Sequence, residues 1–161
     1  MKKIILDTSV CIDLNNGKLL KTVLQLAYEF VLPDVIIAEL EEPAGKMLLK
    51  IGFVEEGTTG EETGVIYSLR NKYKEPSFND LMALLLAKRN VCYLITADNA
   101  LRNAAKQEGV TVHGLLWLMD VLVELKIITK SNAFKALKSI IEAGSWLPKR
   151  ECEERFKKWR R

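Results

Sequence analysis

Short apolar runs alternate along the chain with longer segments of helical periodicity. The runs are rich in Ile, Val, Leu, Phe and Tyr, which is typical of buried strands. They comprise residues 3–6, 28–32, 53–55, 91–96 and 110–112. Because strands that alternate with helices form βαβ units with right-handed crossovers, the pattern predicts a parallel sheet. We therefore expect an α/β fold with three α/β/α layers, in which a short, mainly parallel β-sheet is flanked by helices.

Helices are predicted from periodicity, from capping residues and from prolines at first helical positions. They are expected directly after Asp7 and at about 19–26, 33–40, 43–52, 61–74, 78–89, 97–108, 114–126, 130–142 and 148–159. The helix that follows Ser77 is apolar almost all round between Leu81 and Ala87, which is typical of a helix buried inside a fold. We expect it to be the central helix.

Length and composition agree with one globular domain. The chain has 161 residues, of which 48% are hydrophobic and 28% charged, with four prolines. These values exclude a disordered or fibrous chain. No linker divides the sequence, so we expect a single domain over residues 1–161, with additional C-terminal helices and a basic arm at about 127–161.

The sequence contains no recognisable secretion or membrane signal. Lys2 and Lys3 lead into an apolar run that stops at Asp7 and is too short for a signal-peptide core. The most apolar helical stretch, 114–125, contains two acidic residues and is shorter than a membrane span. We expect a cytoplasmic protein without a membrane partner. The stretch 114–125 is expected to be a core helix, with a homodimer face or a partner groove as alternatives.

Cysteine and histidine usage narrows the possible chemistry. Cys11, Cys92 and Cys152 lie far apart without a C-x-x-C pair, so we expect reduced structural thiols rather than disulfides or a zinc site. His113 is the only histidine, which excludes H-E-x-x-H zinc chemistry. Any metal must therefore be held mainly by oxygen.

Two aspartates follow predicted strands. Asp7 comes directly after the first strand, and Asp98 follows the strand that ends at Thr96, with one residue between. Ligand sites in open parallel sheets lie beyond the carboxyl ends of the strands, so both side chains should project from the same edge. Each aspartate alone is also a favoured helix N-cap. Two strands nevertheless deliver two carboxylates to one place.

Asp80 and Glu39 are the other acidic candidates. Asp80 stands three residues after Ser77 in a capping-box arrangement, yet it shares a helical stripe with apolar residues. An ionised group on a buried face is costly unless it is paired or bound to metal, which favours a functional role. Glu39 continues the spacing of an apolar helical face, whereas the next two glutamates begin the exit from that helix. The remaining aspartates considered, Asp13, Asp34 and Asp120, are expected to be solvated, capping or surface residues.

These residues resemble the PIN-domain nuclease family, which includes the VapC-type toxins of prokaryotic toxin–antitoxin pairs. The resemblance covers roughly residues 3–115 and depends on the order of four acids and their flanks. It runs through Ile5-Leu6-Asp7-Thr8-Ser9-Val10, Pro33–Leu40 with Glu39, Asn79-Asp80, and Ile95-Thr96-Ala97-Asp98-Asn99. After residue 113 the chain departs from a minimal PIN toxin, because a second small turn residue is missing after Gly114 and more helices follow.

The resemblance implies a metal-dependent endoribonuclease whose catalytic and metal-binding residues are Asp7, Glu39, Asp80 and Asp98. It further implies a supporting hydroxyl from Thr8 or Ser9, and Thr96 resembles the threonine that precedes the family's last acid. Carboxylates without histidine or thiolate partners select hard cations, so Mg²⁺ or Mn²⁺ is expected. Family chemistry implies products with 5′-phosphate and 3′-hydroxyl ends. A toxin would also have a small antitoxin protein as partner, and a homodimer is expected.

Basic residues are candidates for RNA contact. Residues 149–161 contain seven Lys or Arg and three Glu, a net charge of +4 in a chain of net charge +3. Phe156 and Trp159 lie among these charges and give either a docking face or a stacking surface. Single-stranded or loop RNA is the expected substrate, because splayed nucleotides can enter a cleft. The expected phosphate contacts are Arg102, Lys158, Arg160 and Arg161, with Lys18, Lys72 and Lys74 as further candidates.

Two alternatives remain open at this stage. A phosphatase of the haloacid dehalogenase type also places an aspartate after the first strand, but it has a second aspartate where this chain has Ser9. The other alternative is a catalytically silent PIN-like scaffold that binds RNA or protein and uses its acids only as helix caps. Stabilisation and activation by Mn²⁺ would distinguish a nuclease from a scaffold.

Overall fold

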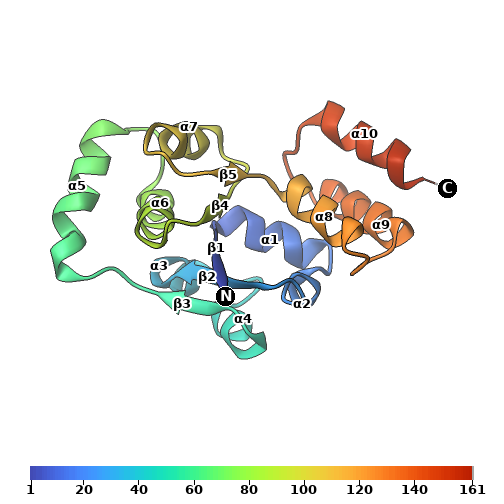
Figure 1. Ribbon diagram of the computed structural model, residues 1–161, viewed down its shortest axis with the longest axis horizontal. Helices are drawn as coiled ribbons and strands as arrows, with labels where there is room; N and C mark the ends of the chain where they lie inside the picture. Colours follow the sequence, from blue (N-terminus) through green and yellow to red (C-terminus); the bar gives the residue numbers. More distant parts are fainter. Residues whose placement is uncertain (161) are drawn as a thin grey trace.

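A five-stranded parallel sheet forms the centre of the computed structural model, which describes residues 1–160 (Figure 1). The strand order is β3-β2-β1-β4-β5, and every neighbouring pair runs parallel. The predicted α/β fold with a parallel sheet is thereby confirmed. The strands are β1 Lys2–Leu6, β2 Tyr28–Pro33, β3 Val54–Glu56, β4 Tyr93–Ile95 and β5 Val112–His113.

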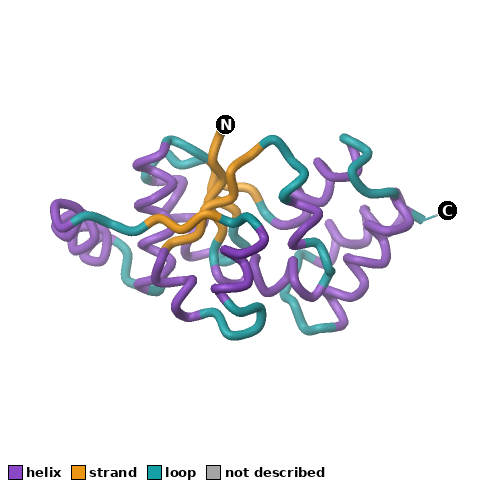
Figure 2. The backbone as a smooth tube through the Cα atoms, turned by 90° about the horizontal axis from the view of Figure 1, so that it is seen from below, coloured by secondary structure: helices purple, strands orange, loops and turns teal. Residues whose placement is uncertain are grey.

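Helices cover both faces of the sheet, as Figure 2 shows from below. Successive strand residues face opposite sides, so Ile4 and Leu6 join one hydrophobic cluster while Ile5 joins the other. The first cluster is completed by α1 to α4 and α8 to α10, and the second by α5 to α7. The helices are α1 Thr8–Asn16, α2 Leu20–Val23, α3 Asp34–Glu39, α4 Gly45–Ile51, α5 Thr63–Lys72, α6 Phe78–Asn90, α7 Asn99–Gln107, α8 Leu115–Glu124, α9 Lys130–Glu142 and α10 Lys149–Trp159, with a 3₁₀ turn at Gly60–Glu62.

Helix α6 is the central helix that the sequence predicts. It begins after the N-cap Ser77, and all of its residues from Leu81 to Ala87 are buried. It packs against β1, β2 and β4. Because the helix has no free face in this stretch, its first turn is held rigidly at the edge of the sheet where the strands end.

Several predicted boundaries differ from those observed, and two of the differences have local causes. Helix α7 begins at Asn99 rather than Ala97, because the side chain of Asp98 accepts a hydrogen bond from the backbone of Leu101 and thereby caps the helix. Strand β5 begins two residues later than expected. The N–H of Val110 donates to the carbonyl of Ala105 at 2.9 Å, so this residue still belongs to the C-terminal closure of α7.

Helices α8, α9 and α10 lie side by side at one end of the molecule, beyond α1 (Figure 1). The apolar face of α8 is buried, as expected for a core helix. Trp159 of α10 is only 1% exposed, and the ring of Phe156 packs edge-on against Phe134 of α9 with 4.9 Å between centroids. Of the two interpretations of the aromatic residues in the basic arm, the docking face is therefore the one observed.

Two aspartates expected to be ordinary solvated, capping or surface residues connect distant segments instead. Asp13 of α1 is only 7% exposed and accepts a hydrogen bond of 2.9 Å from the hydroxyl of Ser145, between α9 and α10. Burial raises the pKa of Asp13, an effect that this hydrogen bond opposes. Asp120 of α8 accepts two hydrogen bonds, of 2.6 and 3.2 Å, from the guanidinium of Arg155 in α10. The expectation was wrong for Asp13, which is buried, whereas Asp120 is a partly exposed helix residue whose ion pair joins α8 to α10.

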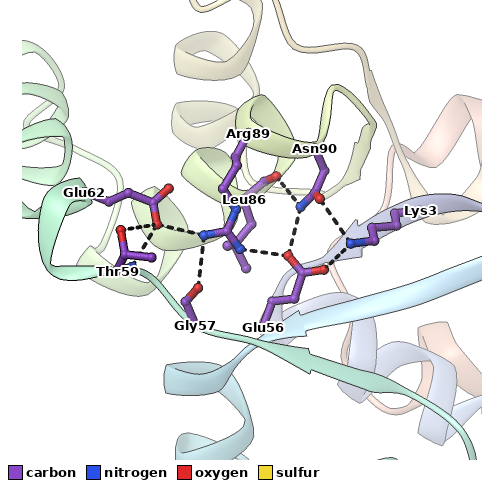
Figure 3. A network of polar contacts seen from close by, with 8 residues as sticks. All are labelled: Lys3, Glu56, Gly57, Thr59, Glu62, Leu86, Arg89 and Asn90. Atoms are coloured by element: carbon purple, nitrogen blue, oxygen red, sulfur yellow. Dashed lines mark hydrogen bonds and ion pairs between the residues drawn. The ribbon is translucent and has the colours of Figure 1, made fainter.

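A polar network joins β1 and β3 to the end of α6 (Figure 3). The carboxylate of Glu56 accepts from Lys3 at 2.6 Å and from Arg89 at 2.8 Å, and also from Asn90. Burial alone would raise the pKa of Glu56, but these hydrogen bonds outweigh it and lower the pKa to about 2. The network fixes the outer strand to the central helix.

The remaining structural expectations concern thiols and membrane segments. Among the described residues, Cys11, Cys92 and Cys152 are all free, and Cys11 and Cys152 are buried. In the same part of the chain, no helix is long and apolar enough to cross a membrane.

Candidate active site

Asp7 lies at the carboxyl end of the central strand β1, directly before α1. Its side chain is 2% exposed. Its Oδ1 accepts hydrogen bonds from the backbone of Val10 at 2.9 Å and from the hydroxyl of Ser9 at 3.1 Å. Its Oδ2 accepts from the hydroxyl of Thr96. The carboxylate is thus a helix cap, as the sequence permits, but one that is nearly inaccessible to solvent.

Thr96 joins the two aspartates that follow neighbouring strands. It is buried at the end of β4, the strand that pairs with β1 through Leu6 and Ile95. Its hydroxyl donates to Asp7 and accepts a hydrogen bond of 3.0 Å from the backbone N–H of Asp98. The side chain of Asp98 is exposed at this edge, where its Oδ1 caps α7. The sheet therefore brings both acids to one edge, as expected.

Asp80 reaches the same edge from the first turn of α6. It forms the capping box with Ser77: the hydroxyl accepts from the Asp80 backbone, and the Asp80 Oδ2 accepts from the Ser77 backbone, both at 3.0 Å. The side chain is half-buried. Burial raises the pKa of Asp80, and the charges of Asp98 and Glu39 raise it further. Asp80 therefore helps to cap α6 and also lies among the other acids.

Glu39 ends α3 and is held by two side chains. Its Oε2 accepts from the amide of Asn79 at 2.6 Å and from the hydroxyl of Thr8 at 3.2 Å. Asn79 is the functional candidate that the sequence interpretation missed. The only available signal was its place beside Asp80, because the 40 positions that separate it from Glu39 carry no periodic pattern. The amide holds one oxygen of the Glu39 carboxylate against the first turn of α6, which also carries Asp80.

The four acids form one electrostatic group. Burial raises the pKa of Asp7 to about 6, although the hydrogen bonds from Thr96, Val10 and Ser9 oppose this, and the charge of Asp80 raises the pKa further. Asp80 is in turn affected by the charges of Asp98 and Glu39. Such mutual effects require short separations, since charges more than about 10 Å apart are largely screened.

The donor set fits a hard cation in its chemistry. Within residues 1–160, no three His, Cys, Asp or Glu side chains stand close enough together to form a ready-made metal site. Each of the three outer acids nevertheless binds its protein donors through a single oxygen: Oε2 of Glu39, Oδ2 of Asp80 and Oδ1 of Asp98. The second oxygen of each has no hydrogen bond among the described residues. Anchored carboxylates with an available oxygen suit Mg²⁺ or Mn²⁺.

A family model described as a PIN domain matches residues 3–161. The chain belongs to the PIN-domain family. PIN domains are typically nucleases that use divalent metals, which supports a hydrolase. Family membership also makes the haloacid dehalogenase alternative wrong. The order of the four acids, on which the resemblance depended, thus led to the correct family.

A solved structure shows the same fold. It is a PilT N-terminus domain protein from the hyperthermophilic archaeon Sulfolobus solfataricus P2. It is 17% identical to this PIN domain and superposes with a TM-score of 0.54. The match covers 76% of this chain and 94% of the archaeal chain, and at this identity it bears on the fold alone. A comparison with curated proteins finds no match.

The basic residues expected to contact RNA do not form one surface in this PIN domain. Arg102 of α7 is half-buried, and its Nη2 donates to the carbonyl of Thr96 at 3.1 Å. Lys158 and Arg160 are exposed at the far end of α10, where the guanidinium of Arg160 lies over the ring of Phe134. Lys72 is paired with Glu108, the C-cap residue of α7. Arg161 lies outside the described residues. Of the three expected residues that the structure describes, Arg102, Lys158 and Arg160, only Arg102 lies at the acidic edge.

Proposed function

We propose that this PIN domain is a metal-dependent endoribonuclease that hydrolyses RNA at the edge formed by Asp7, Glu39, Asp80 and Asp98. The observation that carries the proposal is the nearly complete burial of Asp7 within an electrostatically coupled group of acids. A buried carboxylate that shares its edge with further carboxylates repels them and is costly to ionise. That cost is accounted for if the acids hold a divalent cation in the working enzyme.

Asp7, Asp80 and Asp98, with Glu39, would hold Mg²⁺ or Mn²⁺. A bound cation of this kind activates water and offsets the charge that develops on a phosphodiester. The protein's own contribution is to orient the ligands. Thr96 fixes Asp7 relative to the backbone of Asp98, while Asn79 and Thr8 fix Glu39.

The hydroxyls of Thr8 and Ser9 have different supporting roles in this proposal. Ser9 donates to the buried Asp7, so it positions a ligand from within the first turn of α1. Thr8 donates to Glu39, an exposed acid that RNA would be able to reach. Substitution of Thr8 is accordingly expected to weaken substrate binding as well as turnover.

The test is cleavage of a mixed panel of structured and unstructured RNAs with Mn²⁺, Mg²⁺ or EDTA. Asp7→Asn and Asp80→Asn should each reduce cleavage by at least a hundredfold, and Glu39→Gln should reduce it as well. Asp34→Asn and Glu41→Gln are the matched controls, because they make the same chemical change at exposed acids outside the group. Cleavage that continues in EDTA, or that both aspartate variants retain, would falsify the proposed site.

One observation favours a second candidate, a silent PIN-like scaffold that binds RNA or protein. Asp7, Asp80 and Asp98 each cap a helix, so the fold uses all three without a metal. A scaffold predicts no stabilisation by Mn²⁺. The nuclease predicts a rise in melting temperature with Mn²⁺ concentration that the Asp7→Asn variant loses, because a ligand that binds only the folded state stabilises it by mass action.

A toxin role is a separate proposal about the biology of the same site. It predicts that expression of the wild type arrests growth, whereas the Asp7→Asn variant does not. It also predicts a small antitoxin that binds the protein and restores growth, and a homodimer in solution. Growth arrest that persists in the inactive variant would exclude RNA cleavage as its cause.

A further inference from the structure

A pocket of about 290 Å³ opens directly beside the acidic edge. Its lining includes Ala97 and Asn99, the two residues that flank Asp98, and Arg102 one turn further along α7. The opposite walls come from the start of α8 and from the start of α10 with the segment before it. Figure 1 shows how the chain returns after α9 to bring α10 alongside α8. The C-terminal helices thus complete a pocket that adjoins Asp98.

The wall formed by Arg102 is fixed in place. Its Nη2 donates to the carbonyl of Thr96 at 3.1 Å, and its buried Nε has no hydrogen-bond partner among the described residues. A Cβ atom at Gly114 would stand 3.4 Å from this guanidinium, so the absence of a side chain there leaves room for it. The ring of Trp117, also in the lining, is stacked on His113 with 4.0 Å between centroids. Both groups are therefore oriented before a ligand arrives.

The chemistry of the lining fits a nucleobase better than a phosphate. Arg102 supplies donors, Glu151 supplies acceptors, and the amide of Asn99 supplies both. Trp117 and Leu147 add apolar surface for a flat ring. The second arginine in the lining, Arg155, pairs with Asp120 at 2.6 Å and also lies 4.0 Å from the carboxylate of Glu151, so acids on two helices offset its charge. A phosphate would be repelled by the carboxylate of Glu151, whereas a base offers both donors and acceptors along its edges.

We propose that this pocket binds the base of the nucleotide next to the cleaved bond, and that it prefers guanine. Guanine offers O6 and N7 as acceptors to a guanidinium, and its N2 amino group donates to a carboxylate. Arg102 and Glu151 are the matching protein groups. The position beside the cleaved bond rests on the proposed nuclease function, because the pocket adjoins Asp98; base binding itself does not depend on that function.

Binding is tested without metal, by calorimetric titration of the protein in EDTA with 5′-GMP, IMP, AMP, CMP and UMP. IMP is the sensitive probe because it lacks only the amino group that Glu151 would accept. One hydrogen bond to a charged group contributes about 1.5–3 kcal/mol, so GMP should bind about 12- to 150-fold more tightly than IMP. Glu151→Gln should abolish this difference. Glu153→Gln, an exposed glutamate of the same helix outside the pocket, should retain it.

A parallel cleavage assay separates failure of the pocket from failure of the nuclease. Cleavage that needs Mn²⁺ and Asp7, combined with equal binding of all five nucleotides, overturns the pocket and leaves the nuclease standing. Selective GMP binding that depends on Glu151, without any cleavage, supports the pocket and overturns the nuclease. An equal loss of selectivity in Glu151→Gln and Glu153→Gln also overturns the pocket. Melting temperatures of both variants that equal the wild-type value confirm that each variant folds.

Discussion

Replacement of Asp7 by asparagine should stabilise the metal-free protein at neutral pH, although it leaves one of the hydrogen bonds of the carboxylate mismatched. The carboxyl group has a pKa of about 6 in the folded protein, compared with an ordinary value of 3.8. Between these pH values the folded state binds more protons than the unfolded state, so stability falls as the pH rises from about 4 to about 6. The difference corresponds to about 3 kcal/mol at pH 7.5. An asparagine side chain at this position would avoid the cost because it carries no charge.

The hydrogen bonds of Asp7 reduce the expected gain. Two carboxylate oxygens accept from Thr96, Ser9 and Val10, whereas an amide has only one oxygen. One mismatched contact costs about 1 kcal/mol. The net stabilisation of Asp7→Asn at pH 7.5 is therefore about 1–2 kcal/mol. At pH 4 the wild-type carboxyl is largely protonated, so the variant should gain nothing or be slightly less stable.

Urea denaturation in EDTA measures the difference in the free energy of unfolding between Asp7→Asn and the wild type, at pH 4 and at pH 7.5. Asp34→Asn, at an exposed first-turn position of α3, is the control, and its difference in stability from the wild type should be the same at both pH values. Addition of Mn²⁺ at pH 7.5 should then reverse the order, since only the wild type would gain from binding. An Asp7→Asn variant that is less stable than the wild type at pH 7.5 in EDTA refutes the reasoning, because burial would then not be the dominant influence on this carboxyl.

Three further predictions concern other contacts. Asn79→Ala should lower kcat with little change in melting temperature, because it releases the exposed Glu39 without opening a cavity; an unchanged kcat would deny the amide a positioning role. Glu56→Gln should reduce the loss of stability on acidification. The pKa of Glu56 is about 2 in the folded protein, so stabilisation by its ionised form is present above about pH 4.5 and is lost as the pH falls through about 2. Denaturation curves between pH 2 and 7 test this. Trp159→Ala should lower the free energy of unfolding by about 3–5 kcal/mol, because it leaves a cavity beneath α10. Faster proteolysis between α9 and α10 should accompany this loss. Stability within 1 kcal/mol of the wild type would contradict the docking of this helix.

Local sequence signals predicted the elements that carry the acids. The apolar run before Asp7, the capping residue Ser77 and the apolar stretch after Asp80 each depend on neighbours within one or two helical turns, and all three were interpreted correctly. Strand and helix alternation then places both strand-end acids at one edge, because parallel strands share the direction of their carboxyl ends. The edge of the sheet was therefore predictable without any contact information.

Contacts between distant segments were not predictable in this way. Asp13 has the sequence surroundings of an ordinary helix residue, and only its partner Ser145, 132 positions away, explains its burial. The pocket beside Asp98 combines Arg102 with Glu151, which the sequence assigned to a phosphate contact and to an arm helix respectively. Charge alone could not separate these roles, because a charged residue on a helix face has the same pattern whether it faces solvent or another helix.

The burial of Asp7 is what distinguishes a functional acid from a helix cap at this edge. An N-cap contributes about 1 kcal/mol and can do so while exposed, as Asp98 does at the start of α7. Asp7 provides the same kind of cap to α1 while nearly inaccessible, at a cost in ionisation of about 3 kcal/mol that exceeds the value of the cap. Serine or threonine would cap the helix without that cost. The excess of the ionisation cost over the value of the cap is explained if a cation compensates the charge of Asp7 in the active protein. The Asp7→Asn variant should therefore be more stable without metal and inactive for the same reason, because it lacks that charge.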